Sequence, residues 1–204
     1  MNLTPEDLAR ADYYAILARL FQAPPDAAFL EALAAAGQLC DVSAEAAQGD
    51  LPKAWAALTH ATAKATPESA GREYEALFVA VGRPQVVLYA SWYLTGFMME
   101  KPLALLRDDL AALGLARRAE VLEPEDHFAA LMEVMRHLIS DVSRPDDQRL
   151  AMQQRFFLAH IDPWNWKLCD ALEGAAGAGL YRATANLTRA FMTIEKSFLQ
   201  VDTK

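Results

Sequence analysis

The sequence has few cysteines and a shortage of basic residues, and both features exclude classes of protein. Its two cysteines, Cys40 and Cys169, lie far apart in no metal-binding or redox spacing, so we expect both to be reduced core residues. The 19 Lys and Arg residues are outnumbered by 27 Asp and Glu, which gives a formal net charge of -8. Because a phosphate backbone repels such a surface, we expect no nucleic-acid partner. The acidic surface suits a basic partner, although ordinary solubility charge explains it equally well.

Long hydrophobic runs are also absent from the sequence. No apolar run approaches the roughly 20 residues that span a bilayer, and residues 1–6 lack the basic region and apolar core of a secretory signal. We therefore expect a cytoplasmic protein that does not insert into a membrane.

The common catalytic and metal-binding motifs are missing as well. There is no G-x-x-x-x-G-K-[ST] phosphate loop, no H-E-x-x-H and no pair of E-x-x-H motifs. A glycine cluster at Gly174, Gly177 and Gly179 follows a helical pattern instead of a strand, so we interpret it as a turn between helices. The sequence therefore predicts no catalytic residue, no metal and no cofactor.

Composition indicates the fold class. Alanine is abundant, β-branched residues are sparse, and no segment alternates apolar and polar positions for long. We predict an all-α protein, a single domain over residues 1–204 with about eight or nine helices. The charged connector of residues 115–122 has no strong turn residue, and we predict that it is a hinge between halves of the chain.

Thr4, Pro5 and the acids that follow predict the start of a helix that runs to about Phe21. Apolar residues at helical spacing indicate the other main helices. A short aromatic helix after Ser91 is expected to include Trp92, Phe97 and Met99. The stripe of the helix over residues 128–139 consists of Phe128, Leu131, Met132, Met135, Leu138 and Ile139. The stripe of the last helix consists of Leu180, Thr184, Leu187, Phe191, Ile194 and Phe198.

The segment Glu123-Pro124-Glu125-Asp126-His127 concentrates polar chemistry at one helix mouth. A proline at the first helical position followed by acids is a good helix start, because acids oppose the positive end of the helix dipole. This interpretation gives no reason for His127. An aspartate and a histidine at one helix N-terminus can instead bind a cationic or amide-bearing ligand.

A metal site is the main alternative for this region. Asp126, Glu133 and His137 fall at i, i+7 and i+11, on the face opposite the apolar stripe. The i to i+7 distance is two helical turns, about 10 Å, which is too long for one ion without ligands from a second helix. A solvated polar face explains the three residues better.

Aromatic residues cluster earlier in the chain. Tyr74, Leu77 and Phe78 follow a helical stripe that continues to Val81, and Tyr89 and Trp92 follow a proline-rich break. Each residue taken singly is most simply core. Aromatic clusters beside polar clefts also serve as recognition surfaces.

These segments together resemble the family of TorD/DmsD/NarJ-type redox enzyme maturation chaperones. The resemblance covers roughly residues 74–198, and its most specific part is the D-H helix start. The residues that carry it are Tyr74, Leu77, Phe78, Tyr89, Ser91, Tyr93, Glu123, Pro124, Asp126, His127, Glu133, Met135, Phe156, Phe157, His160 and Trp164.

The resemblance implies a cytoplasmic chaperone dedicated to a molybdopterin oxidoreductase. Such proteins bind the client's N-terminal twin-arginine leader, hold the apoenzyme while cofactor is inserted, and delay export. Some members form domain-swapped homodimers, so the resemblance allows a monomer or a swapped dimer. Some are reported to bind guanine nucleotide, which the resemblance alone suggests here.

The leader-binding site that the resemblance implies is compatible with the residues of these segments. A twin-arginine leader is basic and then apolar, so its receptor needs acids beside an apolar groove. We predict that the peptide-binding residues are Tyr74, Leu77, Phe78, Tyr89, Ser91, Trp92, Glu123, Glu125, Asp126 and His127. Substitution of Asp126 or His127 is expected to weaken leader binding and to leave the fold intact. A passive helical adaptor, with these aromatic residues as core, is a further alternative.

Overall fold

The computed structural model describes residues 3–39, 49–79 and 83–200. Within these ranges the chain forms ten α-helices and one π-helical segment, with no strand, so the prediction of an all-α protein is confirmed. No helix in these ranges is both long and apolar enough to cross a membrane. The elements are α1 (Pro5–Gln22), α2 (Ala27–Leu39), α3 (Asp50–Lys64), α4 (Pro67–Tyr74), the π-helical η2 (Glu75–Val79), α5 (Ala90–Thr95), α6 (Lys101–Ala112), α7 (Phe128–Ser140), α8 (Asp146–His160), α9 (Asn165–Gly174) and α10 (Leu180–Gln200).

The helices fall into two compact units, each assembled from separate stretches of sequence. The first unit comprises Met1–Gln22, Leu88–Trp166 and Glu195–Lys204, and the second comprises Ala23–Val87 and Lys167–Ile194. The expectation of one domain over residues 1–204 therefore stays a prediction.

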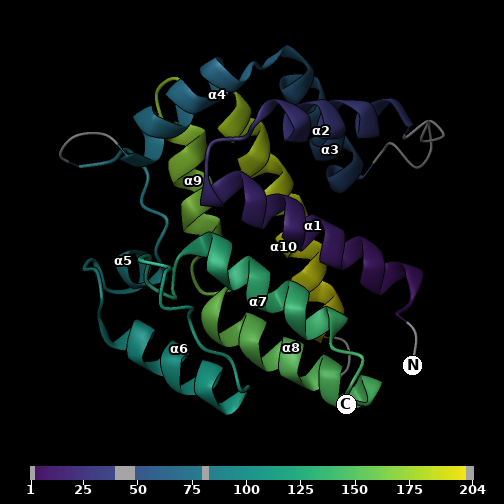
Figure 1. The fold of residues 1–204 in the computed structure, drawn as a ribbon, viewed down its shortest axis with the longest axis vertical. Helices are drawn as coiled ribbons and strands as arrows, with labels where there is room; N and C mark the ends of the chain where they lie inside the picture. The colour runs from purple at the N-terminus through teal and green to yellow at the C-terminus, as the bar shows by residue number, and fades with distance from the viewer. Residues whose placement is uncertain (1–2, 40–48, 80–82, 201–204) are drawn as a thin grey trace. The chain divides into compact units, whose positions relative to one another are not determined.

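In the first unit, α1 packs along α7 (Figure 1). Helix α1 begins where its sequence predicts, because the Asp7 amide donates to the Thr4 hydroxyl at 3.0 Å and Pro5 needs no amide partner. The apolar stripe predicted for α7 is buried at every position, from Phe128 to Ile139. Fully burying one such side chain contributes about 1.5–3 kcal/mol, so this stripe anchors the unit.

Helix α10 belongs to the first unit from Glu195 onward, and the end of this helix departs from the predicted stripe. Ile194 and Phe198 are 48% and 41% exposed, whereas Glu195 is fully buried. The Arg10 guanidinium on α1 donates to both carboxylate oxygens of Glu195, at 2.7 and 2.9 Å. The Tyr14 hydroxyl donates to the same carboxylate at 2.9 Å, and burial together with this negative charge raises the Tyr14 pKa. The helix therefore turns a charged residue inward, because α1 supplies its partners.

The second unit contains the turn that joins α9 to α10. The Glu73 carboxylate, at the end of α4, accepts the backbone amides of Gly179, Leu180 and Tyr181 at 2.9, 3.1 and 2.8 Å. These amides have no partner within α10, since they lie at or just before its start. Gly177 adopts a φ of 78°, which glycine tolerates without strain. The glycine cluster is thus a helix-to-helix turn, as predicted.

Cys169 is buried on α9 and forms no disulfide. Burial raises the pKa of its thiol to about 12, so the thiol is protonated at neutral pH. This agrees with the expectation of a reduced core residue. Cys40 lies outside the described residues.

The aromatic helix after Ser91 is shorter than predicted. Helix α5 ends at Thr95, because Gly96 adopts a left-handed φ of 84° and its amide bonds back to the Trp92 carbonyl. The expectation that Phe97 and Met99 belong to the helix is therefore wrong. Both side chains are instead exposed in the segment before α6, at 68% and 70%.

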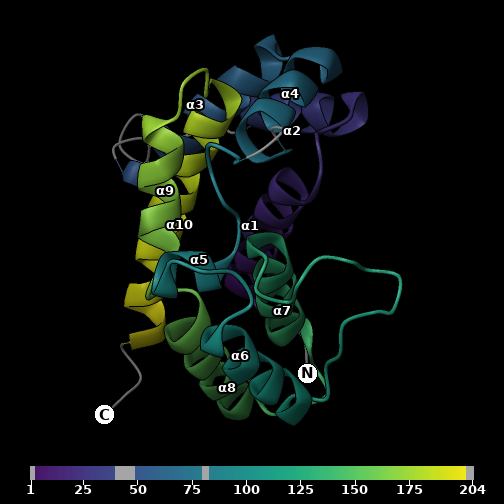
Figure 2. The same cartoon turned by 90° about the vertical axis from the view of Figure 1, so that its left-hand side faces the viewer.

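The predicted hinge of residues 115–122 lies inside the first unit. It belongs to the wide loop between α6 and α7, which reaches away from both helices in Figure 2. The chain passes between the units elsewhere, at the ends of the ranges given above. A hinge for domain swapping at this loop stays a prediction.

Candidate functional site

The starts of α5 and α7 are joined by Ser91 and Asp126. The Ser91 backbone amide and hydroxyl both donate to Oδ2 of Asp126, at 2.9 and 2.6 Å. The backbones pair as well, since the Ala90 amide donates to the Asp126 carbonyl and the Phe128 amide donates to the Leu88 carbonyl. Two segments that are distant in sequence are therefore locked together at the E-P-E-D-H motif.

Asp126 is 1% exposed and its second oxygen is not used. Oδ1 is buried and has no hydrogen-bond partner among the described residues. An unsatisfied buried acceptor costs about 1–3 kcal/mol, and more when it is charged. Such a cost is typical of functional positions, where a ligand or a water supplies the missing donor.

His127 caps the first turn of α7. Its Nδ1 accepts the Ala129 amide at 3.2 Å, so in the neutral ring the proton lies on Nε2. Burial lowers the pKa of His127, and the nearby carboxylates of Glu123 and Asp126 oppose that shift only in part. The ring also contacts Tyr89 edge-on, with centroids 5.1 Å apart. His127 is thus a neutral side chain that offers one N–H donor.

These contacts correct two expectations about the motif. Helix α7 begins at Phe128 and not at Pro124, because Asp126 and His127 pair with the backbone before α5. Asp126 therefore does not share a helical face with Glu133 and His137. Glu133 is exposed and pairs with Arg136 at 2.8 Å. No group of three His, Cys, Asp or Glu residues that could hold a metal ion occurs in the part of the chain that the structure describes.

Glu123 and Glu125 are the outer acids of the motif. Glu123 is exposed and accepts a hydrogen bond from the Tyr89 hydroxyl. Glu125 is bound on both sides by guanidinium groups, since Arg107 donates to Oε2 at 2.9 Å and Arg117 donates to Oε1 at 3.3 Å. Burial opposes ionisation of Glu125, but these arginines outweigh burial and lower its pKa. Glu125 is therefore negative at neutral pH and already has cationic partners.

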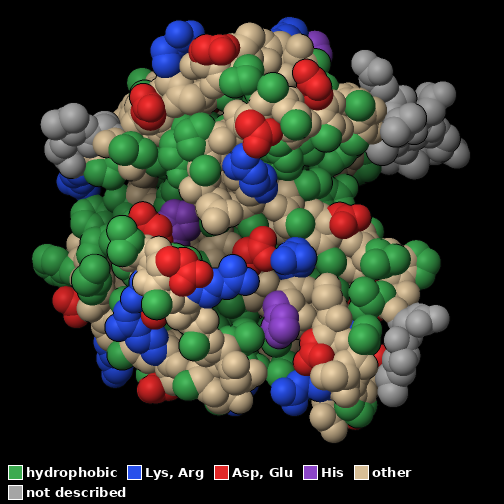
Figure 3. Space-filling model, in the orientation of Figure 1, with side chains coloured by type: hydrophobic (Ala, Val, Ile, Leu, Met, Phe, Trp, Pro, Cys, Tyr) green, Lys and Arg blue, Asp and Glu red, His purple; other side chains and the backbone are tan. Residues whose placement is uncertain are grey.

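The remaining predicted residue of this group, Trp92, is half-buried on α5. Next to it, Tyr93 stacks on Trp164 with ring centroids 5.3 Å apart, which ties α5 to the turn between α8 and α9. Beyond α5, hydrophobic side chains gather on the surface of the α5–α6 connection (Figure 3, left edge). The exposed residues there are Leu94, Phe97, Met98 and Met99. We call this cluster the apolar shoulder.

The structure thus brings together one part of the predicted site. Tyr89, Ser91, Glu123, Asp126 and His127 contact one another within the first unit, and we call these five residues the acidic lip. Tyr74, Leu77 and Phe78 belong to the second unit. There Tyr74 and Phe78 contact Tyr181 edge-on, with centroids 5.9 and 4.9 Å away, and Leu77 is 1% exposed. Val81, the end of the predicted stripe, lies outside the described residues.

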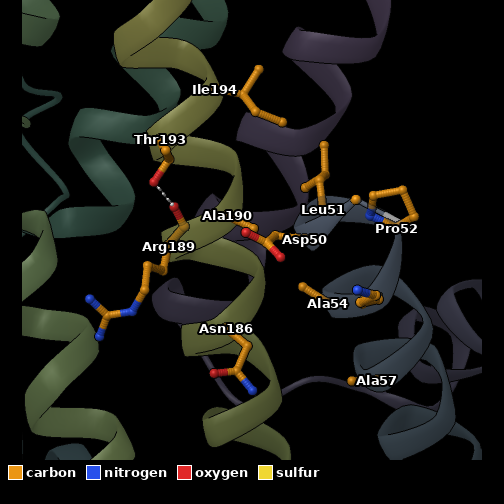
Figure 4. Close-up of a pocket in the computed structure, with 12 residues that line it drawn as sticks. Asp50, Leu51, Pro52, Ala54, Ala57, Asn186, Arg189, Ala190, Thr193 and Ile194 are labelled. Atoms are coloured by element: carbon orange, nitrogen blue, oxygen red, sulfur yellow. Dashed lines mark hydrogen bonds between the residues drawn. The ribbon is translucent and has the colours of Figure 1, made fainter. Parts of the chain in front are cut away.

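A cavity of about 530 Å³ lies elsewhere, in the second unit between α3 and α10. Its wall consists largely of small or apolar residues, including Leu51, Ala54 and Ala190 (Figure 4). Arg189 extends away from α3 in this view and pairs with Asp170 and Glu173. None of the predicted site residues lines this cavity, so its size does not connect it with the acidic lip.

Two residues with a role at the site were missed in the sequence. Arg107 and Arg117 hold Glu125, but no helical spacing relates them to it, because one lies on α6 and the other in the following loop. The only signal was the presence of two arginines in the connector. Pairing across a loop of irregular structure is not encoded by periodicity.

With this geometry defined, comparison with known proteins identifies the family. A family model described as nitrate reductase delta subunit matches residues 44–170, a range that includes the whole acidic lip. The chain belongs to the nitrate reductase delta subunit family.

Individual relatives carry a more specific name. The chain is 30% identical to the chaperone protein TorD of Vibrio cholerae over 129 residues, and 27% identical to that of Photobacterium profundum over 130 residues. The alignments cover 60% of this chain and 59% and 60% of those proteins, so the chain spans about three fifths of the relatives' length. These matches confirm the resemblance to TorD-like maturation chaperones. The relatives are named as chaperones, in agreement with the expectation that the chain is not an enzyme.

A solved structure supports the fold. The crystal structure of a redox enzyme maturation protein from Archaeoglobus fulgidus matches with a TM-score of 0.54 and covers 92% of this chain and 93% of its own. The sequence identity is 18%, so this match shows the fold alone.

Proposed function

We propose that the protein is a cytoplasmic chaperone for a molybdopterin oxidoreductase. It binds the apo form of the client and its N-terminal twin-arginine leader, assists cofactor insertion, and delays export until the client is mature. It acts without a catalytic residue or a cofactor of its own. Membership of the nitrate reductase delta subunit family and the similarity to TorD chaperones support the client class.

The buried Oδ1 of Asp126 is the observation that carries leader recognition. This oxygen lacks a donor, and the neighbouring His127 Nε2 carries a proton in its neutral form. Asp126 therefore offers an acceptor and the next residue, His127, offers a donor, and an extended peptide backbone can use both. The exposed Glu123 adds negative charge for the leader's arginines.

The apolar shoulder is a binding surface for the apolar segment of the leader. It lies at the C-terminal end of α5 and just after it, whereas the acidic lip holds the N-terminal end, and a six-residue helix spans about 9 Å. About three residues of an extended peptide cover that distance. A leader whose apolar segment follows its arginines therefore fits both surfaces.

Cofactor loading of the client tests the proposal. A molybdopterin oxidoreductase that co-purifies with this protein is expressed with and without the chaperone, and the molybdopterin content per purified apoenzyme is measured. We expect full loading only with the chaperone, and reduced loading with its Glu123→Gln variant. Glu133→Gln, which removes an equal charge from the exposed face of α7, is the matched control and should restore loading. Equal loading without the chaperone would contradict the proposal.

A further inference from the structure

The chain carries its own arginine pair at the acidic motif. Arg117 and Arg118 lie in the connector after α6, and Arg117 Nε donates to Oε1 of Glu125 at 3.3 Å. Arg117 also donates to the Val121 carbonyl, which folds the connector back on itself. A carboxylate of the predicted peptide-binding set is therefore already occupied by a guanidinium from the same chain.

The connector has the same order of residues as a twin-arginine leader, with basic residues first and apolar residues after them. Two arginines come first, and Val121 and Leu122 follow four residues later, 41% and 90% exposed. Leu122 is thus an apolar side chain that the fold leaves in solvent, although burial of a leucine is worth about 1.5–3 kcal/mol. A basic pair followed by exposed apolar residues is the chemistry expected of the partner.

The contact between Arg117 and Glu125 is weak enough for another arginine to replace Arg117. The Arg117 side chain is 35% exposed, and a single hydrogen bond of 3.3 Å joins it to Glu125. Ion pairs of this kind contribute about 0.2–1 kcal/mol. Arg107 approaches the opposite oxygen, Oε2, at 2.8 and 2.9 Å, so Glu125 stays in place when Oε1 is vacated. Arg107, Arg117 and Glu125 also line a pocket of about 290 Å³ with Leu110 and Leu115, which leaves room for an incoming side chain.

We propose that the connector is an internal counterpart of the leader, in which Arg117 occupies the Oε1 position of Glu125 until an arginine of the client replaces it. This inference rests on the proposed leader binding and adds its regulation. The internal arginine weakens the binding of peptides that carry an isolated positive charge. A twin-arginine peptide displaces it, because its second contact, on the acidic lip, compensates for the exchange.

Calorimetric titration of a synthetic leader peptide tests this exchange. The peptide is the twin-arginine leader of a molybdopterin oxidoreductase that co-purifies with this protein, and it is titrated into the full chain. Arg117→Ala should bind about two- to five-fold more tightly than the unsubstituted protein, as expected for loss of a competing surface ion pair. Arg118→Ala is the matched control, because it removes the same charge from the adjacent exposed position. It should change affinity less than Arg117→Ala does.

A double-mutant cycle separates the exchange from general charge effects. In a Glu125→Gln background, Arg117→Ala should no longer improve binding, since the competed carboxylate is gone. Equal effects of Arg117→Ala and Arg118→Ala, or an improvement that persists with Glu125→Gln, would overturn the inference and leave leader binding intact. Failure of the unsubstituted protein and of every variant to bind the peptide would overturn leader binding and this inference together.

Discussion

Ser91 donates two hydrogen bonds to a single oxygen of Asp126, one from its amide and one from its hydroxyl. The two residues lie 35 positions apart and both are buried. This contact fixes the start of α5 against the residue that precedes the His127 cap of α7. The acidic lip is therefore a preorganised surface, held by one buried carboxylate.

Ser91→Ala tests how far this contact stabilises the fold. The substitution removes the hydroxyl donor from a buried carboxylate, so the free energy of unfolding should fall by about 1.5–3 kcal/mol. Ser143→Ala is the matched control, because its hydroxyl bonds to Asp141 in an exposed pair. The control should change stability by less than about 0.5 kcal/mol. Urea unfolding followed by circular dichroism measures both, and equal losses would contradict the assigned role of Asp126.

The lowered pKa of His127 makes the stability of the protein depend on pH. Its pKa is lowered in the folded protein, so the folded state takes up the proton less readily than the unfolded chain, whose histidine titrates near about 6.5. The contribution of His127 is complete above that pH. It decreases as the pH falls from there to the lower folded pKa, and below that value it stays constant.

His127→Asn isolates this effect, because asparagine also caps helices well and does not titrate. The free energy of unfolding of the unsubstituted protein should fall more between pH 7.5 and 5.5 than that of the variant. Comparing the two cancels the contributions of His60, His137 and His160. Parallel pH profiles would show that His127 is not held neutral by burial.

The buried pair of Arg10 and Glu195 predicts a large loss of stability when it is broken. Arg10→Met leaves Glu195 buried without its cation, which should cost about 3–5 kcal/mol. The double substitution Arg10→Met with Glu195→Met should recover most of that loss. Lys196→Met, which removes the exposed partner of Asp162, should cost at most about 1 kcal/mol. Denaturant unfolding that ranks Lys196→Met equal to Arg10→Met would contradict the burial of the pair.

We expect Glu73 to stabilise the second unit. Its carboxylate accepts three amides at the start of α10, so Glu73→Gln should lower the free energy of unfolding by about 1–2 kcal/mol. The neighbouring exposed Glu75 provides the control, and Glu75→Gln should be close to neutral. Amide hydrogen exchange at Leu180 and Tyr181 should accelerate only in the Glu73 variant.

Much of the fold follows from the sequence, because helices are encoded locally. The Thr4-Pro5 start of α1 and the apolar stripe of α7 are confirmed as predicted. The end of α10 is not, because the buried orientation of Glu195 depends on Arg10, 185 residues away. Periodicity assigns a charged residue to the solvent face and cannot register a partner on another helix.

The site shows the same limit. The sequence singled out Asp126 and His127, and the structure brings them together with Tyr89 and Ser91. The sequence pattern predicted that the motif starts a helix. In the structure, an antiparallel bridge between Tyr89 and His127 keeps this segment extended. The histidine that the helix-start interpretation left unexplained is the cap of α7. Long-range pairing decides both points.

Isothermal titration calorimetry measures leader binding by the acidic lip. The twin-arginine leader peptide of a co-purifying molybdopterin oxidoreductase is titrated into the unsubstituted protein, the double variant Glu123→Gln with His127→Asn, and the control Glu133→Gln. Because His127→Asn preserves the helix cap, circular dichroism should be unchanged in all three. We predict a saturable 1:1 isotherm for the unsubstituted protein and the control, and an affinity lowered by about 10- to 100-fold in the double variant. Equal affinity in all three proteins would show that the acidic lip does not bind the leader.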